Sequence, residues 1–501
     1  MRAGWAALLL AAATPAFGQI VVAEPTLERD RFDWVMEGNK ASLVVLAEEG
    51  VVPRETAIEL AKALKTVEAR AAEPGKERDS NYLAIEADLV RLMGPEASRL
   101  HTGRSRQDLG QVGRRGEWRE AFLAQYEDFI EARAALLAVA RTHPDAPLPF
   151  YTHAVQAQPT TLGHYLGGYL AAFDRQSDRY REVWPRINMS PLGGGVGGTS
   201  SFPLNRDRHA ELLGFSTVID NSFDAVQVAL QDSGSDIAFS AATGSLLVSM
   251  LTADLLTQYG NPYPWFQLVE GDQSGSSSIM PQKRNPSAIE ELHEAAGLTT
   301  GLATSWSVIA QSIPSGTDSY KKTPLPINSL AASGEMWGRM TKMLGALRFF
   351  PDRAMERLND DYSVVTELAN LLQREGNVPF RVGHHFASEM VNYGRANRLR
   401  APDLPYSVAQ KTFSEATRHF GLPETKFPLS SARFKKALSP TNMVRSARPR
   451  GGPQLSEVAR MLAQAEARIA ADRQWLASVR TRLEAADKLR AAAFDNLASG
   501  G

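Results

Sequence analysis

The chain has 501 residues, enough for two to four domains and a large buried core. Hydrophobic residues make up 43% and charged residues 22% of the sequence, as in an ordinary soluble globular protein. The formal net charge of −1 excludes a general attraction to nucleic acid or anionic membranes, and the absence of cysteine excludes disulfides and a lipoprotein anchor.

Residues 1–18 are typical of a signal peptide that is removed on export. Arg2 supplies a positive charge, and residues 6–13 form a short apolar run that cannot span a bilayer. The sequence Ala16-Phe17-Gly18 places small residues at the two positions that a signal peptidase reads. We therefore expect cleavage before Gln19 and a periplasmic or secreted protein, with a simple N-terminal helix as the alternative.

Helical periodicity dominates the rest of the chain. Apolar residues recur at three- and four-residue steps near both ends, over 43–64 and over 461–483. The apolar stretch Ile237–Leu256 has too many Ala, Ser and Asp residues for a membrane span, and predicts a helix buried on several sides of a bundle. We expect a mainly α protein with an N-terminal helical domain over 19–112, a central helical bundle over 113–360 and a C-terminal helical domain over 361–501.

The segment Gly275–Pro286 combines small residues, hydroxyls, a cation and an amide. It reads Gly-Ser-Ser-Ser-Ile-Met-Pro-Gln-Lys-Arg-Asn-Pro, and a helix is expected to begin near Pro286. The hydroxyls, the backbone N–H groups and Lys283 together suit a carboxylate, or an enolate-like dianion that develops from one. Composition alone leaves a flexible linker as an equal alternative.

The order of residues in this segment resembles the signature of the aspartase/fumarase superfamily, Gly-Ser-Ser-x-Met-Pro-x-Lys-x-Asn-Pro. One position departs, because Ser276 stands where the family has Gly. Four further segments resemble the argininosuccinate lyase branch of that superfamily: 100–108, 151–159, 191–215 and 366–381. The resemblance therefore covers roughly residues 30–430.

This resemblance implies a fold, a reaction and an assembly. Members of the superfamily eliminate across a C–N or C–O bond of a succinyl group and release fumarate. They are homotetramers with a shared helical bundle, each active site takes residues from three subunits, and they need no metal or organic cofactor. The implied subunit has three domains around a long central bundle. The implied partners are a small N-succinyl amine and other copies of the chain, with no nucleic acid and no membrane after processing.

The resemblance also assigns roles to individual residues. Ser277 matches the proposed general base, which takes the proton from the carbon next to the succinyl carboxylate. Lys283 and Asn285 match the residues that hold this carboxylate, so their contacts strengthen as charge develops on it. His153 matches the histidine that protonates the leaving amine, directly or through water, and Glu290 matches the carboxylate paired with it.

A second group of residues matches the positions that bind the remainder of the substrate. Ser105 and Arg106 correspond to residues that bind the other carboxylate, where arginine suits bidentate contact. Thr152 is expected to add a hydroxyl donor there. The other substrate contacts implied by the resemblance are Gln107, Ser278 and Tyr320.

Three departures from the branch concern the leaving amine. Gln107 stands where the branch has Asn, residues 227–234 lack the branch's Asp-Arg-Asp stretch, and Thr317–Lys322 replaces a Tyr-Asn-Lys-Asp-Leu-Gln loop. The expected function is an argininosuccinate lyase-like elimination from argininosuccinate or an analogue. The departures and the signal segment favour another N-succinyl amine, such as an aminopolycarboxylate. A non-catalytic structural protein is a third alternative, against which the retained candidate residues argue.

Overall fold

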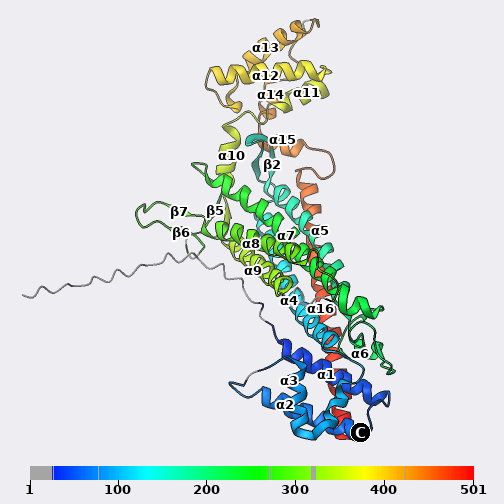
Figure 1. Ribbon diagram of the computed structural model, residues 1–501. Coiled ribbons are helices and arrows are strands. Elements are labelled where there is room, and N and C mark those ends of the chain that lie inside the picture. Colours follow the sequence, from blue (N-terminus) through cyan, green and yellow to red (C-terminus); the bar gives the residue numbers. More distant parts are fainter. Residues whose placement is uncertain are drawn as a thin grey trace, which may run out of the picture.

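The computed structural model describes residues 25–500 except 26, 77, 270, 272, 317–322 and 424. The expected signal segment and Tyr320 lie outside these residues. The molecule is elongated, with a helical region at each end of a long bundle (Figure 1). The first end is built from α1 (Arg31–Glu48), α2 (Arg54–Ala71), α3 (Tyr82–Met93) and the 3-10 helix η1 (Gly94–His101).

Long helices form the middle of the molecule, and the mainly α fold predicted from the sequence is confirmed. The bundle helices are α4 (Arg106–Thr142), α5 (Leu162–Ile187), α7 (Ala229–Tyr259), α8 (Ser287–Ala310), α9 (Leu325–Ala346) and α16 (Leu455–Ser499). Shorter elements between them are α6 (Arg206–Leu212), the π-helical turn η2 (Asp224–Val228), α10 (Pro351–Asn359) and α15 (Pro440–Ser446).

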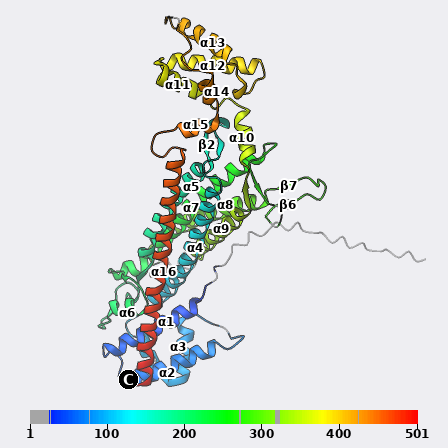
Figure 2. The ribbon, with the colours of Figure 1, turned by 180° about the vertical axis from the view of Figure 1, so that it is seen from behind.

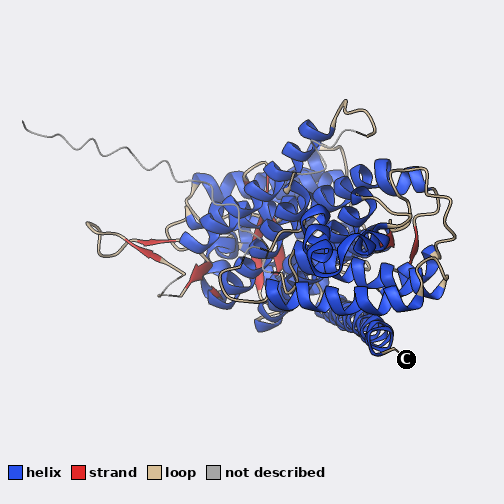
Figure 3. Cartoon of the chain, turned by 60° about the horizontal axis from the view of Figure 1, so that its bottom comes forward, coloured by secondary structure: helices blue, strands red, loops and turns tan. Residues whose placement is uncertain are grey.

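Strands are few and short, and they pair as two-stranded ribbons (Figure 3). The antiparallel ribbons are β1 (Pro147–Thr152) with β2 (Val155–Thr161), β5 (Phe266–Leu268) with β8 (Leu347–Phe349), and β6 (Gly275–Ser276) with β7 (Arg284–Asn285). The parallel ribbon is β3 (Met189–Ser190) with β4 (Thr217–Val218). Two of these ribbons carry predicted site residues.

Aromatic residues spaced along one face of α4 explain why this helix lies at the centre of the bundle. Phe122, Tyr126 and Phe129 recur at steps of four and three, so they share a face. The ring of Phe129 lies 5.1 Å from that of Tyr180 in α5 and 4.9 Å from that of Trp337 in α9. The Phe129–Tyr180 pair packs edge to face, which adds about 0.5–1.5 kcal/mol beyond the area buried, and the Phe129–Trp337 pair is tilted.

The last helix, α16, ties the bundle to the N-terminal region. It is 45 residues long and runs along the outside of the bundle to the N-terminal end (Figure 2). Midway, Asp472 accepts a hydrogen bond from the fully buried Arg133 of α4 at 2.5 Å. Near its end, Phe494 and Leu497 belong to the same buried cluster as α1 and α2. The domain boundaries expected at 112 and 360 stay predictions, and α16 itself packs away from the C-terminal helical cluster.

That cluster forms the other end of the molecule. It contains α11 (Thr366–Gly376), α12 (Phe380–Ala396), the 3-10 helix η4 (Ala401–Asp403), α13 (Tyr406–His419) and α14 (Ser431–Ala437). Its core is separate from that of the bundle and centres on four phenylalanines: Phe386, Phe413, Phe427 and Phe434.

Helix α7 contains the apolar stretch predicted to lie inside a bundle. It packs against α5, α8 and α9, yet Phe239, Leu246 and Met250 are 48%, 58% and 54% exposed. Their spacing places them on one side of the helix. Among the described residues, the segment Asp224–Tyr259 is also long and apolar enough to cross a membrane, a test that core helices of soluble proteins pass as well. Its packing against three bundle helices favours the bundle interpretation.

Candidate active site

The loop that carries Ser277 connects the two strands of a very short ribbon. Gly275 pairs with Asn285, and Ser276 pairs with Arg284, so residues 277–283 form the connection between β6 and β7. A Cβ at position 275 would lie 2.5 Å from Oγ of Ser287, so a larger residue there would force the Ser287 side chain to move. The ribbon projects from the side of the bundle (Figure 1). Ser276, the departure from the family signature, is exposed.

The hydroxyl oxygen of Ser277 already receives backbone hydrogen bonds. The N–H of Met280 donates to Oγ at 3.0 Å, and that of Ile279 donates at 3.4 Å. Serine commonly makes such local turns, so these bonds have a structural use too. Two N–H donors on one oxygen are also what a serine alkoxide needs, because they stabilise negative charge on it.

The other candidate residues of this segment surround the start of α8. Pro286 is the N-cap residue and α8 begins at Ser287, which confirms the predicted helix start. Glu290 lies in the first turn and is exposed. The remaining candidates are Ser278 and Lys283, which are exposed, and Asn285, which is half-buried in β7.

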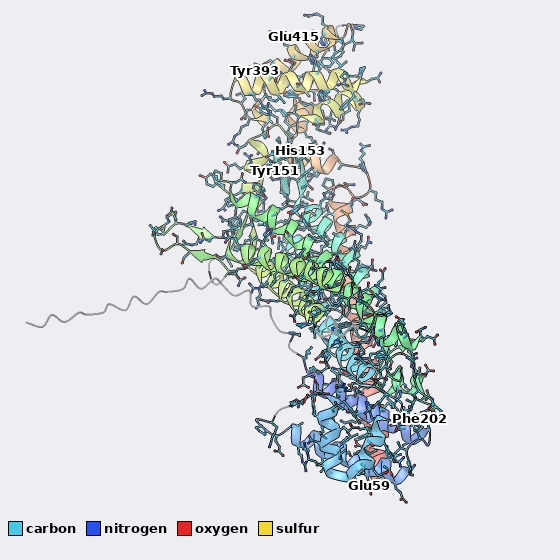
Figure 4. The ribbon with its side chains drawn as sticks, viewed as in Figure 1. Glu59, Tyr151, His153, Phe202, Tyr393 and Glu415 are labelled. Atoms are coloured by element: carbon cyan, nitrogen blue, oxygen red, sulfur yellow. The ribbon has the colours of Figure 1, made fainter. Side chains whose placement is uncertain are left out.

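Thr152 and His153 lie at the tip of the β1–β2 hairpin. Thr152 pairs with Val155, so His153 and Ala154 form the turn. Their φ angles are 52° and 60°, a left-handed conformation that costs energy in residues with a side chain. Both Thr152 and His153 are exposed. A tight turn therefore presents the imidazole outward from the end of the bundle, beside the C-terminal helical cluster (Figure 4).

A cavity of about 780 Å³ lies beneath this hairpin. Tyr151 of β1 and Ala154 of the turn contribute to its lining. Trp265 and Phe266 supply aromatic walls, and Asp254 supplies a carboxylate that accepts from two tyrosine hydroxyls. His153 is not among the residues that line this cavity.

Ser105 and Arg106 form the start of α4. Ser105 is the N-cap residue, and its Oγ accepts from the N–H of Gln107 at 3.2 Å. The hydroxyl hydrogen of Ser105 therefore stays available to donate to a ligand. Arg106 is exposed, and Gln107 is half-buried. A hydroxyl and a guanidinium at the positive end of a long helix suit an anionic group.

One chain does not bring all of these residues together. Ser105 and Arg106 are at the beginning of α4, while Thr152 and His153 follow its end. The helix has 37 residues, so its ends lie about 55 Å apart at 1.5 Å per residue. Within the described part of the chain, no hydrogen bond or ion pair joins His153 to Glu290, and their expected pairing stays a prediction. An active site that uses both Arg106 at the start of α4 and His153 beyond its end must therefore combine residues of different copies of the chain.

The sequence departure at 227–234 begins beside α4, because the turn η2 contacts that helix. Gln227 belongs to the π-helical turn η2, and its Nε2 donates to the carbonyl of Val196 at 2.9 Å. A Cβ on Gly316 would lie 4.0 Å from Oε1 of Gln227, so the chain leading to the altered 317–322 segment passes beside it. π-Turns inside helices are frequent at functional sites. The sequence alone did not single out this turn.

The sequence analysis also missed Asp108. It is fully buried and completes a capping box with Ser105. The Ser-x-x-Asp spacing ahead of a helical segment was the available signal. It identifies a helix start, but local sequence does not show that the carboxylate is buried.

His209, close to this region on α6, is expected to make stability depend on pH. It is 2% exposed, and neither ring nitrogen has a hydrogen-bond partner among the described residues. Burial, followed by the charges of Arg104 and Arg206, lowers its pKa to about 3. An unfolded histidine takes up a proton below about pH 6.5, so the folded state loses about 1.4 kcal/mol of stability per pH unit below that value, down to about pH 3.

The variant His209→Leu should remove this contribution. Between about pH 7.5 and about pH 5, the wild type should lose about 2 kcal/mol more than the variant. Thermal unfolding at the two pH values measures the difference, with the exposed His384→Gln as control. An identical pH dependence in wild type and His209→Leu would contradict the prediction.

Comparisons with known proteins show the family to which the chain belongs. The family model described as "Lyase" matches residues 46–301, and the model described as "Argininosuccinate lyase C-terminal" matches residues 362–445. Argininosuccinate lyase 1 of Shouchella clausii is 30% identical over 481 residues, covering 93% of this chain and 94% of the relative. Argininosuccinate lyase of Methanosarcina barkeri is 29% identical, covering 94% and 93%.

Solved structures give the same family. A crystal structure of EDDS lyase with formate superposes with a TM-score of 0.83 at 29% identity, over 94% of this chain and 92% of that chain. A fumarate lyase from Mesorhizobium sp. BNC1, at 20% identity and a TM-score of 0.68 over 87% and 94%, shares the fold. The chain therefore belongs to the argininosuccinate lyase branch of the aspartase/fumarase superfamily and is a carbon–nitrogen lyase.

Proposed function

We propose that the protein releases fumarate from an N-succinyl amine in active sites built from several copies of the chain. The observation that carries this proposal is the distance of about 55 Å, along α4, between the anion-binding start of the helix and the hairpin with His153. The start of α4 and the hairpin with His153 each carry groups for one part of the reaction. An assembly that places the start of α4 of one copy beside the hairpin of another copy completes the active site.

Ser277 is the base in the proposed reaction. It removes the proton from the carbon next to the carboxylate that Lys283 and Asn285 hold. The C–N bond then breaks, its electron pair goes to nitrogen, and the electrons of the C–H bond form the double bond of fumarate. The N–H groups at 3.0 and 3.4 Å from Oγ support this role, because they stabilise the alkoxide.

His153 is the proposed proton donor to the leaving nitrogen, and Glu290 of another copy is its proposed partner. The exposed turn at the end of the bundle supports this role, since an imidazole presented outward can reach a neighbouring copy. Ser105 and Arg106 are proposed to bind the second carboxylate, together with Thr152. Ser278 and Tyr320 are proposed as further substrate contacts.

The assembly is proposed to be a homotetramer. The exposed apolar face of α7, formed by Phe239, Leu246 and Met250, supports a bundle shared between copies. Val308 and Ile309 of the neighbouring helix α8 are also exposed, at 61% and 44%. Exposed apolar residues that gather on two packed helices favour contact with another copy of the chain.

The leaving amine is proposed to differ from arginine. The altered 317–322 segment supports this proposal, because the resemblance implies that the loop it replaces helps hold the amino-acid end of argininosuccinate. Gln107, which stands where the branch has Asn, and the missing Asp-Arg-Asp stretch at 227–234 also support it. The likeness to EDDS lyase at 29% identity makes an aminopolycarboxylate the first alternative to test, and argininosuccinate itself is the second. Residues 1–18 support export to the periplasm or the medium, with cleavage before Gln19.

The test uses the chain starting at Gln19 and follows fumarate by ultraviolet absorbance. The substrates are argininosuccinate, ethylenediamine disuccinate and a panel of other N-succinyl amines. Fumarate from at least one is expected, with argininosuccinate not the best. Fumarate from none would refute the proposed function, and turnover of argininosuccinate alone would refute the altered amine. Full-length chain in the cytoplasm would refute export.

A further inference from the structure

We propose that Asp108 is a positioning residue that fixes Ser105 and Arg106 against the glycine loop 193–198. The inference rests on the proposed function, because it concerns how that site is assembled. Asp108 touches no substrate in this proposal and acts only through its neighbours. Its loss should therefore weaken binding more than it slows the chemical step.

Both carboxylate oxygens of Asp108 are fully used. Oδ1 accepts from the backbone N–H groups of Ser105 and Leu109, each at 2.9 Å. Oδ2 accepts from those of Gly193 at 3.1 Å and Gly195 at 3.0 Å. The side chain is 0% exposed. A buried carboxylate is costly unless it is hydrogen-bonded, and here four N–H donors meet that requirement.

Burial and the groups around Asp108 shift its pKa in opposite directions. Burial raises the pKa of Asp108 to about 6, while the backbone donors and the charge of Arg104 act in the opposite direction. Arg206 of α6 also faces it and is favoured in its charged form by Asp108. Arg206 in turn donates to the carbonyls of Leu192 and Ile219 at 3.2 and 2.8 Å, so it fixes the same loop from the other side.

On one side, Asp108 determines how α4 begins. The bond from Ser105 N–H completes the capping box and holds Ser105 in an extended conformation, with φ −133° and ψ 162°. Arg106 follows directly as the first helical residue. The directions of the Ser105 hydroxyl and of the Arg106 side chain therefore depend on this one carboxylate.

On the other side, Asp108 determines the path of the glycine loop. Gly193 and Gly195 have φ angles of +82° and +60°, which side chains rarely allow, and this conformation accompanies the two N–H bonds to Oδ2. The carbonyl of Val196 in the same loop accepts from Gln227. One hydrogen-bonded path thus links the start of α4 to the π-helical turn.

This path joins two of the segments that depart from the branch. Gln107 is two residues after Ser105, and Gln227 contacts the glycine loop. Gln227 begins the stretch 227–234, which lacks the branch's charged Asp-Arg-Asp, whereas Gln107 stands where the branch has the shorter amide Asn. Asp108 therefore positions the groups that we expect to distinguish the leaving amine, as well as those that bind a carboxylate.

The variant Asp108→Asn tests the inference. It keeps the size of the side chain but turns one acceptor into an NH₂ group that faces N–H donors. KM for the substrate and the inhibition constant for fumarate should each rise by about 10-fold or more, as for loss of a buried hydrogen-bonding group, while kcat falls by less than about threefold. Amide exchange of the 193–195 segment should be slow in the wild type and faster in the variant.

Glu367→Gln is the matched control. Glu367 is also a buried carboxylate, 3% exposed, and it accepts from Arg374 and Ser446 in the C-terminal cluster. Its loss should lower the melting temperature without changing KM. If Asp108→Asn lowers the melting temperature and leaves KM and fumarate inhibition unchanged, as the control does, Asp108 has only a structural role and the inference is overturned.

If Asp108→Asn does not fold, amide exchange in the wild type still tests the inference. Fast exchange of the Gly193 and Gly195 amides in the wild type would overturn the inference, and protection supports it. Fumarate release by the wild type reports on the proposed function alone. Its absence is therefore distinguishable from a failure of Asp108 to hold the loop.

Discussion

Replacing Ser277 by alanine is expected to lower kcat for fumarate release by about 10²–10⁴-fold, the contribution of a positioned general base. KM should change by less than about threefold, because Lys283 and Asn285 still hold the carboxylate in both ground and transition states. Steady-state kinetics with the best N-succinyl amine, following fumarate, measures both constants. The size of the loss reflects the difficulty of removing a proton from carbon without a base in contact.

Ser276→Ala is the matched control for this experiment. Ser276 is the neighbouring hydroxyl, but it is exposed and its backbone pairs with Arg284 in the ribbon. Its loss should leave kcat unchanged within about twofold, as for an ordinary surface substitution. Full activity in Ser277→Ala would refute the assignment of the base. Equal losses in both variants would indicate damage to the loop instead.

Mixing two inactive variants is expected to restore activity. Arg106→Ala and His153→Gln damage opposite ends of α4, about 55 Å apart in one chain. If each site takes the two residues from different copies, an equal mixture of subunits leaves about a quarter of the sites intact in a closed symmetric assembly. Unfolding and refolding the mixed chains, then measuring fumarate release, should therefore recover about a quarter of wild-type activity.

A second mixture distinguishes recovery through shared active sites from a general gain of activity when two variant subunits associate. Thr152→Val and His153→Gln lie in the same hairpin, so every site receives one damaged copy of that segment whatever the arrangement. Their mixture should not exceed the activity of the better variant alone. No recovery with Arg106→Ala and His153→Gln, under conditions where the wild type refolds, would show that the copies do not share sites.

Local sequence predicted the elements of this fold well and their contacts less well. The helix expected near Pro286 begins at Ser287, and the stretch Ile237–Leu256 lies within α7, since spacing and capping are local properties. The β6–β7 ribbon has two residues on each strand, too few for an alternating pattern. The packing of α16 against the N-terminal region depends on contacts between distant segments, which periodicity does not encode.

The candidate site was likewise predicted from the sequence only in part. The family resemblance located Ser277, His153 and Arg106, and the structure places them on three separate parts of the molecule. The resemblance could not indicate that Asp108 is buried, because an acidic residue at the start of a helix is usually solvated. Nor could it locate Gln227 in a π-helical turn, since such a turn depends on how the helix meets the glycine loop.

The course of α16 has a consequence for how the chain folds during synthesis. The N-terminal helices leave the ribosome long before Phe494 and Leu497, which belong to the same core, have been made. Domains usually fold in the order of their synthesis, and exposed apolar surface favours aggregation until they do. The N-terminal core can therefore be completed only after α16 has been made. Loss of the last turns of α16 should destabilise α1 and α2, although these helices lie far from α16 in the sequence.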